Sequence, residues 1–335
     1  MSAGTHRALV VVDQIFNQEL ADVAVAPLVT AGWDVDRVEW EVGTIENQRA
    51  EVRRLENEGP SPEDTLPSLD RRHDYQVIIT QFAPINRSAL ANGNRLRLVA
   101  VNRSGLQNVD AATAVNRGIE VFNVPGRNAS AVAEHTVALM MTHLRFIATS
   151  HAALKQGTWT ERFPEPGPRE LAEVTVGIVG YGQIGRRVHE LLRPFRSRIQ
   201  IFDPYLDASP ADADMMDLDN LLSTSDVVTI HVPLSDQTRD LIGRPELARL
   251  KPTSILVNTA RAEIVNQGAL RDALSSGQLG GAALDVFETE PISANDVLVR
   301  SDRTTLTPHL AGTTRQALVQ GPLWIAEHLA RLGPS

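Results

Sequence analysis

The sequence contains no cysteine, which excludes disulfide bonds, zinc sites built on thiolates and cysteine nucleophiles. It also lacks an excess of positive charge. Lys and Arg number 32 against 41 Asp and Glu, so neither a nucleic-acid partner nor an anionic membrane surface is expected. The longest apolar stretch, Val137–Met141, is far too short to span a bilayer, and the first residues show no signal-peptide pattern. These absences favour a cytoplasmic location.

What is present is a chain of 335 residues, 42% hydrophobic and 22% charged, which is long enough for about two domains. The N-terminal part alternates expected strands and helices and predicts a small parallel sheet of its own, with strands at 7–12, 35–40, 77–80 and 97–101. One long helix is expected at 128–151 and another at 316–332. The part between them predicts a complete doubly wound α/β sheet, with strands at 174–179, 198–202, 226–232, 254–258, 281–286 and 304–307.

The stretch Val174–Asp203 carries a dinucleotide-binding pattern. A β-branched strand leads into Gly180-Tyr-Gly-Gln-Ile-Gly185, a helix follows, and a second strand ends at Asp203. Gly180 permits the tight turn, Gly182 lets the backbone approach a pyrophosphate, and Gly185 lets the helix pack closely on the strand. The helix N-terminus then offers free N–H groups to the phosphates. Asp203 suits the adenosine ribose and would repel a 2′-phosphate, which favours NAD over NADP.

Three polar residues follow later strands and are expected at the same carboxyl edge of the sheet. They are Arg261, Glu290 and His309. Arg binds a carboxylate through two parallel hydrogen bonds, and His exchanges protons near neutral pH. A neighbouring carboxylate favours the imidazolium form. Two other histidines are interpreted as structural: His135 as a helix residue with an internal hydrogen-bond partner, and His231 as a packed residue ending a strand.

The region from about Gly105 to Thr314 resembles the D-isomer-specific 2-hydroxyacid dehydrogenases, in particular the phosphoglycerate dehydrogenase-like and glyoxylate/hydroxypyruvate reductase-like branches. The matching segments are the glycine motif with Asp203-Pro, together with Asn123–Asn128, Val132–Thr136, His231–Thr238, Val257–Arg261, Leu284–Pro291 and Thr307–Gly312. The resemblance implies an NAD-dependent oxidoreductase acting on the CH–OH group of a small 2-hydroxy acid, or on a 2-oxo acid in reverse.

The resemblance also implies roles for individual residues. Arg261 binds the substrate, His309 is the acid/base, and Glu290 orients it. Asn102, Arg103, Ser104 and Gly105 join Arg261 and His309 in binding the substrate, with backbone N–H groups of the loop on its carboxylate. Contacts with NAD are implied for Gly180, Gly182, Gln183, Ile184, Gly185, Asp203, Val232, Pro233, Thr238, Thr259, Arg261, Asp285, His309 and Gly312. No metal is expected, because side chains supply both the cation and the proton carrier.

The family's split architecture is expected as well. Residues 1–122 and 308–335 would form a flavodoxin-like α/β substrate-binding domain. Residues 123–307 would form a Rossmann NAD-binding domain inserted in it, whose long helices around 128–159 mediate a homodimer. The cleft between the domains is expected to close on the substrate.

Two segments depart from the family pattern and leave the substrate open. Gln107 replaces an Asp and Arg103 replaces a Gly in the substrate loop, and Thr80–Pro84 lacks the arginine that phosphoglycerate dehydrogenases tend to carry. Arg103 could compensate for that arginine or meet another polar tail. An alternative role is an NAD(H)-binding corepressor or sensor of the same fold with little turnover, which the three polar residues do not exclude. A paralogue acting on formate or phosphite finds no support in the substrate loop.

Overall fold

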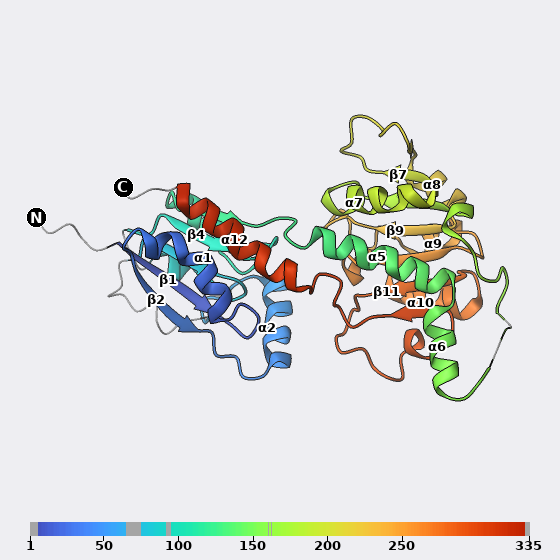
Figure 1. Ribbon diagram of the computed structural model, residues 1–335, viewed down its shortest axis with the longest axis horizontal. Coiled ribbons are helices and arrows are strands. Elements are labelled where there is room, and N and C mark those ends of the chain that lie inside the picture. Colours follow the sequence, from blue (N-terminus) through green and yellow to red (C-terminus); the bar gives the residue numbers. More distant parts are fainter. Residues whose placement is uncertain (1–5, 65–74, 92–94, 160, 162, 332–335) are drawn as a thin grey trace, which may run out of the picture. The chain divides into compact units, whose positions relative to one another are not determined.

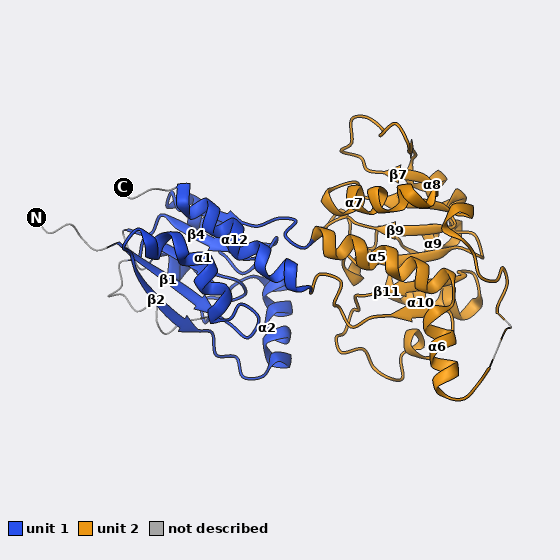
Figure 2. Cartoon of the chain, in the orientation of Figure 1, with its two compact units in different colours: residues 1–128, 314–335 blue, residues 129–313 orange. Residues whose placement is uncertain are grey.

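The computed structural model describes residues 6–64, 75–91, 95–159, 161 and 163–331. The chain forms two compact units, which Figure 2 shows in different colours. Unit 1 comprises residues 1–128 and 314–335, and unit 2 comprises residues 129–313. Both divisions fall later in the chain than the boundaries after 122 and 307 expected from the sequence. Among the described residues, no helix combines the length and the apolar character needed to cross a membrane.

Unit 1 is built on a parallel sheet of five strands in the order β2-β1-β3-β4-β5. This is the strand order of flavodoxin-like folds, as expected. Short runs such as Val-Ile-Ile-Thr at 77–80 are buried on both faces, which is typical of parallel strands. The strands are β1 (Arg7–Val12), β2 (Asp34–Glu39), β3 (Val77–Thr80), β4 (Leu98–Val101) and β5 (Glu120–Asn123).

Helices cover the sheet of unit 1, and the last helix of the chain returns to pack against the first (Figure 1). Ile325 and Leu329 of that last helix join the core formed by Ala21, Val25 and Leu28. The C-terminal helix therefore completes the N-terminal unit. The helices are α1 (Gln18–Thr30), α2 (Ile45–Glu58), α3 (Arg87–Ala91), α4 (Ala111–Asn116) and α12 (Arg315–Arg331).

Unit 2 is built on a second parallel sheet, of seven strands in the order β12-β11-β10-β9-β6-β7-β8. The doubly wound sheet is confirmed, with β8 as an additional two-residue strand at one edge. The strands are β6 (Thr175–Val179), β7 (Arg198–Phe202), β8 (Asp214–Met215), β9 (Val227–Ile230), β10 (Ile255–Asn258), β11 (Gly281–Leu284) and β12 (Thr304–Leu306).

Two apolar cores sandwich this sheet, since alternate residues of each strand face opposite sides. Ile178 and Val257 face the core under α5 and α7, whereas Val179 and Leu256 face the core under α8, α9 and α10. The α-helices are α5 (Ala129–Leu144), α6 (Ile147–Lys155), α7 (Gln183–Leu192), α8 (Leu218–Thr224), α9 (Arg244–Arg249), α10 (Gln267–Ser276) and α11 (Val297–Arg300). Short 3-10 turns lie at η1 (Leu171–Glu173), η2 (Arg193–Phe195) and η3 (Ala262–Ile264).

The prediction of a single long helix at 128–151 is wrong. The chain forms α5 and then α6, because Phe146 between them adopts a left-handed backbone with φ of 53°. This conformation interrupts the helical hydrogen bonds and redirects the chain. Helix α6 buries none of its residues, whereas α5 is buried along most of its length.

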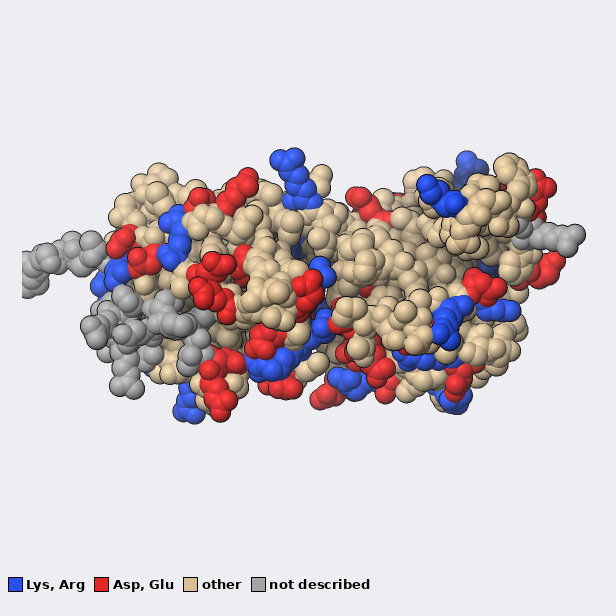
Figure 3. Space-filling view, turned by 90° about the horizontal axis from the view of Figure 1, so that it is seen from below, with Lys and Arg blue, Asp and Glu red and all other residues tan. Residues whose placement is uncertain are grey.

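Charged side chains are mixed rather than segregated. Figure 3 shows Lys and Arg interspersed with Asp and Glu over the face in view, without a broad region of either sign. Oppositely charged side chains form exposed ion pairs, such as Arg244 with Asp272 at 2.6 Å. Such exposed pairs contribute little to stability, about 0–1 kcal/mol each.

Candidate active site

The glycine turn of unit 2 has the geometry that a bound pyrophosphate requires. Gly180 has φ of +92°, and a Cβ on Gly185 would lie 2.2 Å from the carbonyl oxygen of Gly180, so that position must be glycine. Gly182 precedes α7 without a side-chain cap, and no atom lies within 4 Å of where its Cβ would stand. The first N–H groups of α7, including those of Gln183 and Ile184, are therefore open to an anion.

Asp203 lies directly beside this turn, at the end of β7. Its Oδ2 accepts a 2.7 Å hydrogen bond from the Tyr181 backbone N–H, and its Oδ1 accepts one of 2.9 Å from that of Tyr205. The two bonds fix the carboxylate against the phosphate-binding turn. A negative charge at this place suits ribose hydroxyls and opposes a 2′-phosphate.

The loop after β9 borders the same turn. A Cβ on Gly180 would lie 2.7 Å from Cγ1 of Val232, so Val232 packs directly over the turn. Pro233 is exposed, and the Thr238 hydroxyl donates to its carbonyl oxygen at 2.6 Å, which closes the loop. His231, which precedes Val232, is buried and bonds to Thr229 at 3.0 Å. Burial lowers the pKa of His231 to about 3, so it is a neutral packing residue.

The predicted substrate cation and its neighbour follow β10. Arg261 is exposed, and its Nη1 donates to the carbonyl oxygen of Ala260 at 2.7 Å. Thr259 is buried instead, with its hydroxyl 2.9 Å from that of Thr136 on α5. Arg261 thus lies exposed at the carboxyl edge of the sheet. The Thr259 side chain is instead packed against α5.

Glu290 and His309 are brought together although 19 positions separate them. His309 Nδ1 lies 3.0 Å from each carboxylate oxygen of Glu290. Because an ionised carboxylate can only accept, Nδ1 carries the hydrogen and Nε2 is left to exchange a proton. Glu290 is itself held by the Phe287 backbone N–H at 3.1 Å. His309 has φ of 51°, an uncommon backbone for a non-glycine residue and typical of functional sites.

Asp285 is fully buried and holds the loop that carries His309. Its Oδ1 accepts from the Thr307 hydroxyl at 2.5 Å and from the Leu310 N–H at 3.0 Å. Its Oδ2 accepts from the Ala311 N–H at 2.8 Å. Asp285 therefore fixes, through hydrogen bonds, the residues on both sides of His309. Asp285, expected beside the nicotinamide, therefore holds the loop that carries His309, and Gly312 follows that loop.

Two members of this network were not assigned a site role from the sequence. Thr307 bonds to Asp285, and His135 Nε2 lies 3.0 Å from the Thr307 hydroxyl. The prediction that His135 is a helix residue with an internal partner is confirmed. Thr307 could have been considered a site residue because it lies two residues before His309. The sequence alone does not show, however, that its hydroxyl points toward Asp285.

The substrate loop of unit 1 follows β4 at the carboxyl edge of that sheet. The N–H groups of Asn102 and Arg103 are already used, bonding at 2.8 Å to the carbonyl oxygens of Thr80 and Val101. Within the described residues of unit 1, the N–H groups of Ser104 and Gly105 donate to no backbone oxygen. The Asn102 side chain is buried and donates to Gln81 at 2.7 Å.

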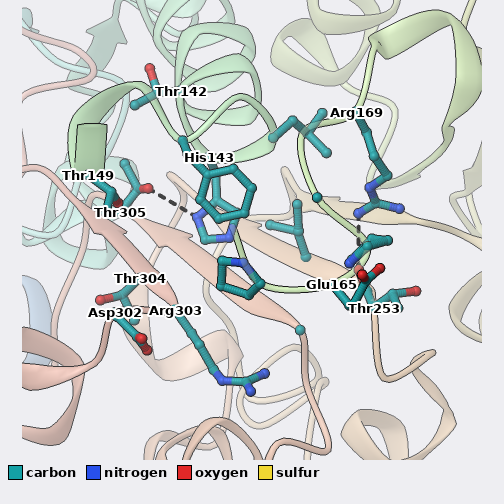
Figure 4. A pocket seen from close by; sticks show the side chains of 17 residues that line it. Thr142, His143, Thr149, Glu165, Arg169, Thr253, Asp302, Arg303, Thr304 and Thr305 are labelled. Carbon is teal, nitrogen blue, oxygen red and sulfur yellow. Dashed lines mark hydrogen bonds between the residues drawn. The ribbon is translucent and has the colours of Figure 1, made fainter. Parts of the chain in front are cut away.

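A separate hollow of unit 2 lies at the opposite, amino edge of its sheet. Ile255 and Thr304, which begin β10 and β12, line it with His143, Arg169 and Arg303. Figure 4 shows the hydrogen bond between His143 and Thr305 and the one that Arg169 donates to the Thr253 carbonyl oxygen. None of the predicted site residues lines this hollow. It is distinct from the carboxyl edge of this sheet, where the predicted residues of unit 2 lie.

Adjacent parallel strands β10, β11 and β12 thus deliver Arg261, Glu290 and His309 to one edge, in a unit with a dinucleotide turn. Such a combination defines a nucleotide-dependent oxidoreductase of the doubly wound α/β class. Comparison with known proteins identifies the family. Residues 137–311 match the model of the D-isomer specific 2-hydroxyacid dehydrogenase NAD binding domain. The chain belongs to this family, and the expected NAD-binding domain is confirmed.

Two curated relatives illustrate the similarity. A glyoxylate reductase from Aeropyrum pernix is 37% identical over 285 residues, covering 81% of this chain and 83% of that protein. A D-3-phosphoglycerate dehydrogenase from Archaeoglobus fulgidus is 33% identical over 278 residues, covering 82% of this chain and 52% of that protein. The chain therefore spans about half the length of this second relative.

Solved structures agree over nearly the whole chain. A protein from Thermus thermophilus aligns with a TM-score of 0.76 and 27% identity, covering 96% of this chain and 95% of that one. A glyoxylate reductase from Paecilomyes thermophila aligns with a TM-score of 0.76 and 25% identity, covering 97% and 94%. The similarity thus includes unit 1, all of which lies outside the residues matched by the family model.

Proposed function

We propose that this chain is an NAD-dependent D-2-hydroxyacid dehydrogenase that interconverts a small 2-hydroxy acid and its 2-oxo acid. The observation that carries the proposal is the pair formed by Glu290 and His309, whose Nδ1 lies 3.0 Å from both carboxylate oxygens. This geometry leaves Nε2 of the imidazole available for proton exchange. Arg261 follows a neighbouring strand of the same sheet. The family membership supports the same reaction class.

The residues divide the work as follows. His309 Nε2 takes the hydroxyl proton in oxidation and returns it to the oxygen in reduction. Glu290 holds the imidazole ring in place and stabilises it when it carries two protons. The Arg261 guanidinium binds the substrate carboxylate, which fixes C2 for transfer. The N–H groups of Ser104 and Gly105 are proposed as further donors to that carboxylate.

The glycine turn and its surroundings fit NAD. Gly182 leaves room for a phosphate, α7 presents N–H groups, and Asp203 supplies the ribose acceptor. When bound, the nicotinamide accepts or donates the hydride. We assign the remaining contacts, by Val232, Pro233, Thr238 and Gly312, to the walls of this site.

The alternative of a corepressor or sensor with little turnover gains nothing from the comparisons. The relatives described above are named as enzymes, among them glyoxylate reductase and phosphoglycerate dehydrogenase. A hydroxypyruvate reductase from Thermotoga maritima, 33% identical over 72% of this chain, has a third related activity. A reductase of small 2-oxo acids is therefore the function we propose.

The proposal is tested by following NADH oxidation with a panel of 2-oxo acids: glyoxylate, hydroxypyruvate, longer 2-oxo acids and their phosphates. We expect turnover with at least one of them, and a product of D configuration where C2 becomes chiral. His309→Gln should abolish most of this activity while the protein still binds NADH, measured by fluorescence titration. Turnover with none of the panel, alongside normal NADH binding, would favour the sensor instead.

We also propose that the chain forms a homodimer through α5, α6 and the residues after them. Helix α6 buries none of its residues, and large apolar side chains are exposed on and beside it. Ile147 is 52% exposed, Leu154 54% and Trp159 79%. Apolar groups gathered in this way favour a covered surface over contact with water. Sedimentation equilibrium should give twice the monomer mass of 36.6 kDa, and Leu154→Glu should shift it toward the monomer.

A further inference from the structure

Two histidines attach helix α5 to the edge strand of unit 2 through threonine hydroxyls. His135 Nε2 lies 3.0 Å from the Thr307 hydroxyl, and His143 Nδ1 lies 3.0 Å from that of Thr305. The histidines are about two helical turns apart and share one face of α5. Thr305 lies in β12 and Thr307 directly follows it, so both bonds join the helix to the segment that leads to His309.

Only the bond made by His135 continues to a buried carboxylate. The Thr307 hydroxyl donates to Asp285 Oδ1 at 2.5 Å, and His135 Nε2 itself lies 3.6 Å from the same oxygen. The Thr305 hydroxyl has no such continuation, since in the described part of the chain it bonds only to His143. The two contacts are therefore alike in chemistry and differ in what lies beyond the threonine.

The positions of the hydrogens in this series follow from the groups themselves. An ionised carboxylate can only accept hydrogen bonds, and a hydroxyl has a single hydrogen to donate. Because the Thr307 hydroxyl gives its hydrogen to Asp285, it can only accept from His135, so His135 Nε2 carries a hydrogen. The bonds run in one direction, from imidazole to hydroxyl to carboxylate, and each donor strengthens the next.

Asp285 depends on these donors because its carboxylate is buried. Only 1% of its side chain is exposed, and a buried carboxylate is costly unless hydrogen bonds or an opposite charge compensate it. Among the residues that the structure describes, no lysine or arginine forms an ion pair with Asp285. Its compensation comes from the Thr307 hydroxyl, which His135 polarises, and from the N–H groups of Leu310 and Ala311.

We propose that His135 is a positioning residue for the dehydrogenase reaction. Through the Thr307 hydroxyl it fixes Asp285, and Asp285 fixes the residues on both sides of His309. His143 makes a similar contact with a threonine but only attaches the helix to the sheet. This inference rests on the proposed dehydrogenase function, and it adds α5 to the elements that place the acid/base.

Steady-state kinetics of NADH oxidation test this role with matched variants of the two histidines, using the 2-oxo acid that the wild type reduces best. His135→Leu removes the donor and should lower kcat about five- to twentyfold, while the KM of the 2-oxo acid and the dissociation constant of NADH stay within about twofold. His135→Gln keeps an N–H donor at a similar reach and should restore kcat to within about threefold of the wild type. His143→Leu removes the corresponding bond to Thr305 and should keep kcat within about twofold.

A merely structural contact would give a different pattern. Both leucine variants would then lower the Tm by similar amounts with kcat unchanged, or would lower kcat equally, and either result would overturn the proposal. Thr307→Val removes the intervening hydroxyl, so its kcat should match that of His135→Leu, and the double variant should show no further loss. Additive losses would likewise refute the proposal. If His135→Leu does not fold, Thr307→Val and Thr305→Val provide the same comparison.

Nitrogen-15 NMR of the full chain with labelled histidines tests the hydrogen-bond series without turnover. The imidazole signals that disappear in His135→Leu belong to His135; they should report a hydrogen on Nε2 and should shift in Thr307→Val. A hydrogen on Nδ1 alone would refute the series, even if the wild type reduces 2-oxo acids. A wild type that reduces none of them would instead refute the dehydrogenase and, with it, the catalytic role of His135, whichever nitrogen carries the hydrogen.

Discussion

The Glu290 carboxylate receives the His309 Nδ1–H at 3.0 Å to both of its oxygens, and this contact leaves Nε2 as the nitrogen that we propose exchanges protons. Neither residue comes from a regular element. Glu290 follows β11, and His309 follows β12, so the pair is assembled at the edge of two adjacent parallel strands. The chemistry proposed for this chain depends on that assembly.

Replacing Glu290 with Gln should lower kcat by about ten- to a hundredfold. This loss is smaller than the full rate contribution of a positioned acid/base, because His309 itself remains. The amide can still contact Nδ1 but cannot stabilise the doubly protonated ring. Stopped-flow measurement of NADH oxidation gives kcat, and fluorescence titration gives NADH affinity, which should stay within about twofold because Glu290 is assigned no cofactor contact. A Glu290→Gln protein with wild-type kcat would show that the contact is structural only.

Asp285→Asn should loosen the His309 loop. The amide has one acceptor oxygen, so either the Ala311 N–H loses its acceptor, or the Leu310 N–H and the Thr307 hydroxyl lose theirs. An unsatisfied buried donor costs about 1–3 kcal/mol, measurable as a lower midpoint in urea unfolding, and kcat should fall with it. Asp207→Asn, at an exposed position, serves as control. Equal unfolding midpoints for both variants would contradict the anchoring role.

Two glycines of the dinucleotide turn should respond differently to alanine. Gly185→Ala places a Cβ 2.2 Å from the Gly180 carbonyl oxygen, so it should destabilise unit 2 by roughly 1–3 kcal/mol or more. Gly182→Ala meets no protein atom within 4 Å and should fold like the wild type while binding NADH more weakly. Thermal unfolding and NADH titration separate the two effects. Unimpaired NADH binding by Gly182→Ala would place the pyrophosphate elsewhere.

Acid should destabilise the protein partly through His143. Burial, and then the charge of Arg169, lower the pKa of His143 from 6.5 to about 4. Between these values the unfolded chain binds a proton that the folded chain does not, so stability falls as the pH drops from 6.5 to about 4, by on the order of 1–3 kcal/mol. His143→Gln removes the titrating group and should flatten this slope in urea unfolding. An unchanged slope would assign the acid sensitivity to other groups.

Much of this architecture was predictable because short buried strands and a glycine turn are local signals. The strand at 77–80 and that at 198–202 were placed correctly, and the fingerprint of Gly180, Gly182 and Gly185 located the cofactor turn. The break at Phe146 was not predictable in this way, since the residues on both sides favour a helix and only the backbone of Phe146 interrupts it.

The contacts that arrange the site are harder to predict, because they join positions far apart in the sequence. Arg103 pairs with Glu56 of α2 and stacks on Phe82. The two segments that depart from the family pattern, the substrate loop and Thr80–Pro84, are therefore in contact with each other. Asp285 lay in a recognisable motif, yet its complete burial and its grip on the His309 loop required the three-dimensional structure. The motifs predicted which residue types form the site. Which of these residues contact one another depends on the fold.

The most direct test of the central claim is a single-turnover measurement with NADH deuterated at C4 and a 2-oxo acid that the wild type reduces. The account predicts deuterium at C2 of a D-configured 2-hydroxy acid, formed by the wild type and slowed by about a hundredfold or more in His309→Ala. Deuterium absent from C2, or a His309→Ala protein that transfers it at the wild-type rate, would contradict the assignment of this site.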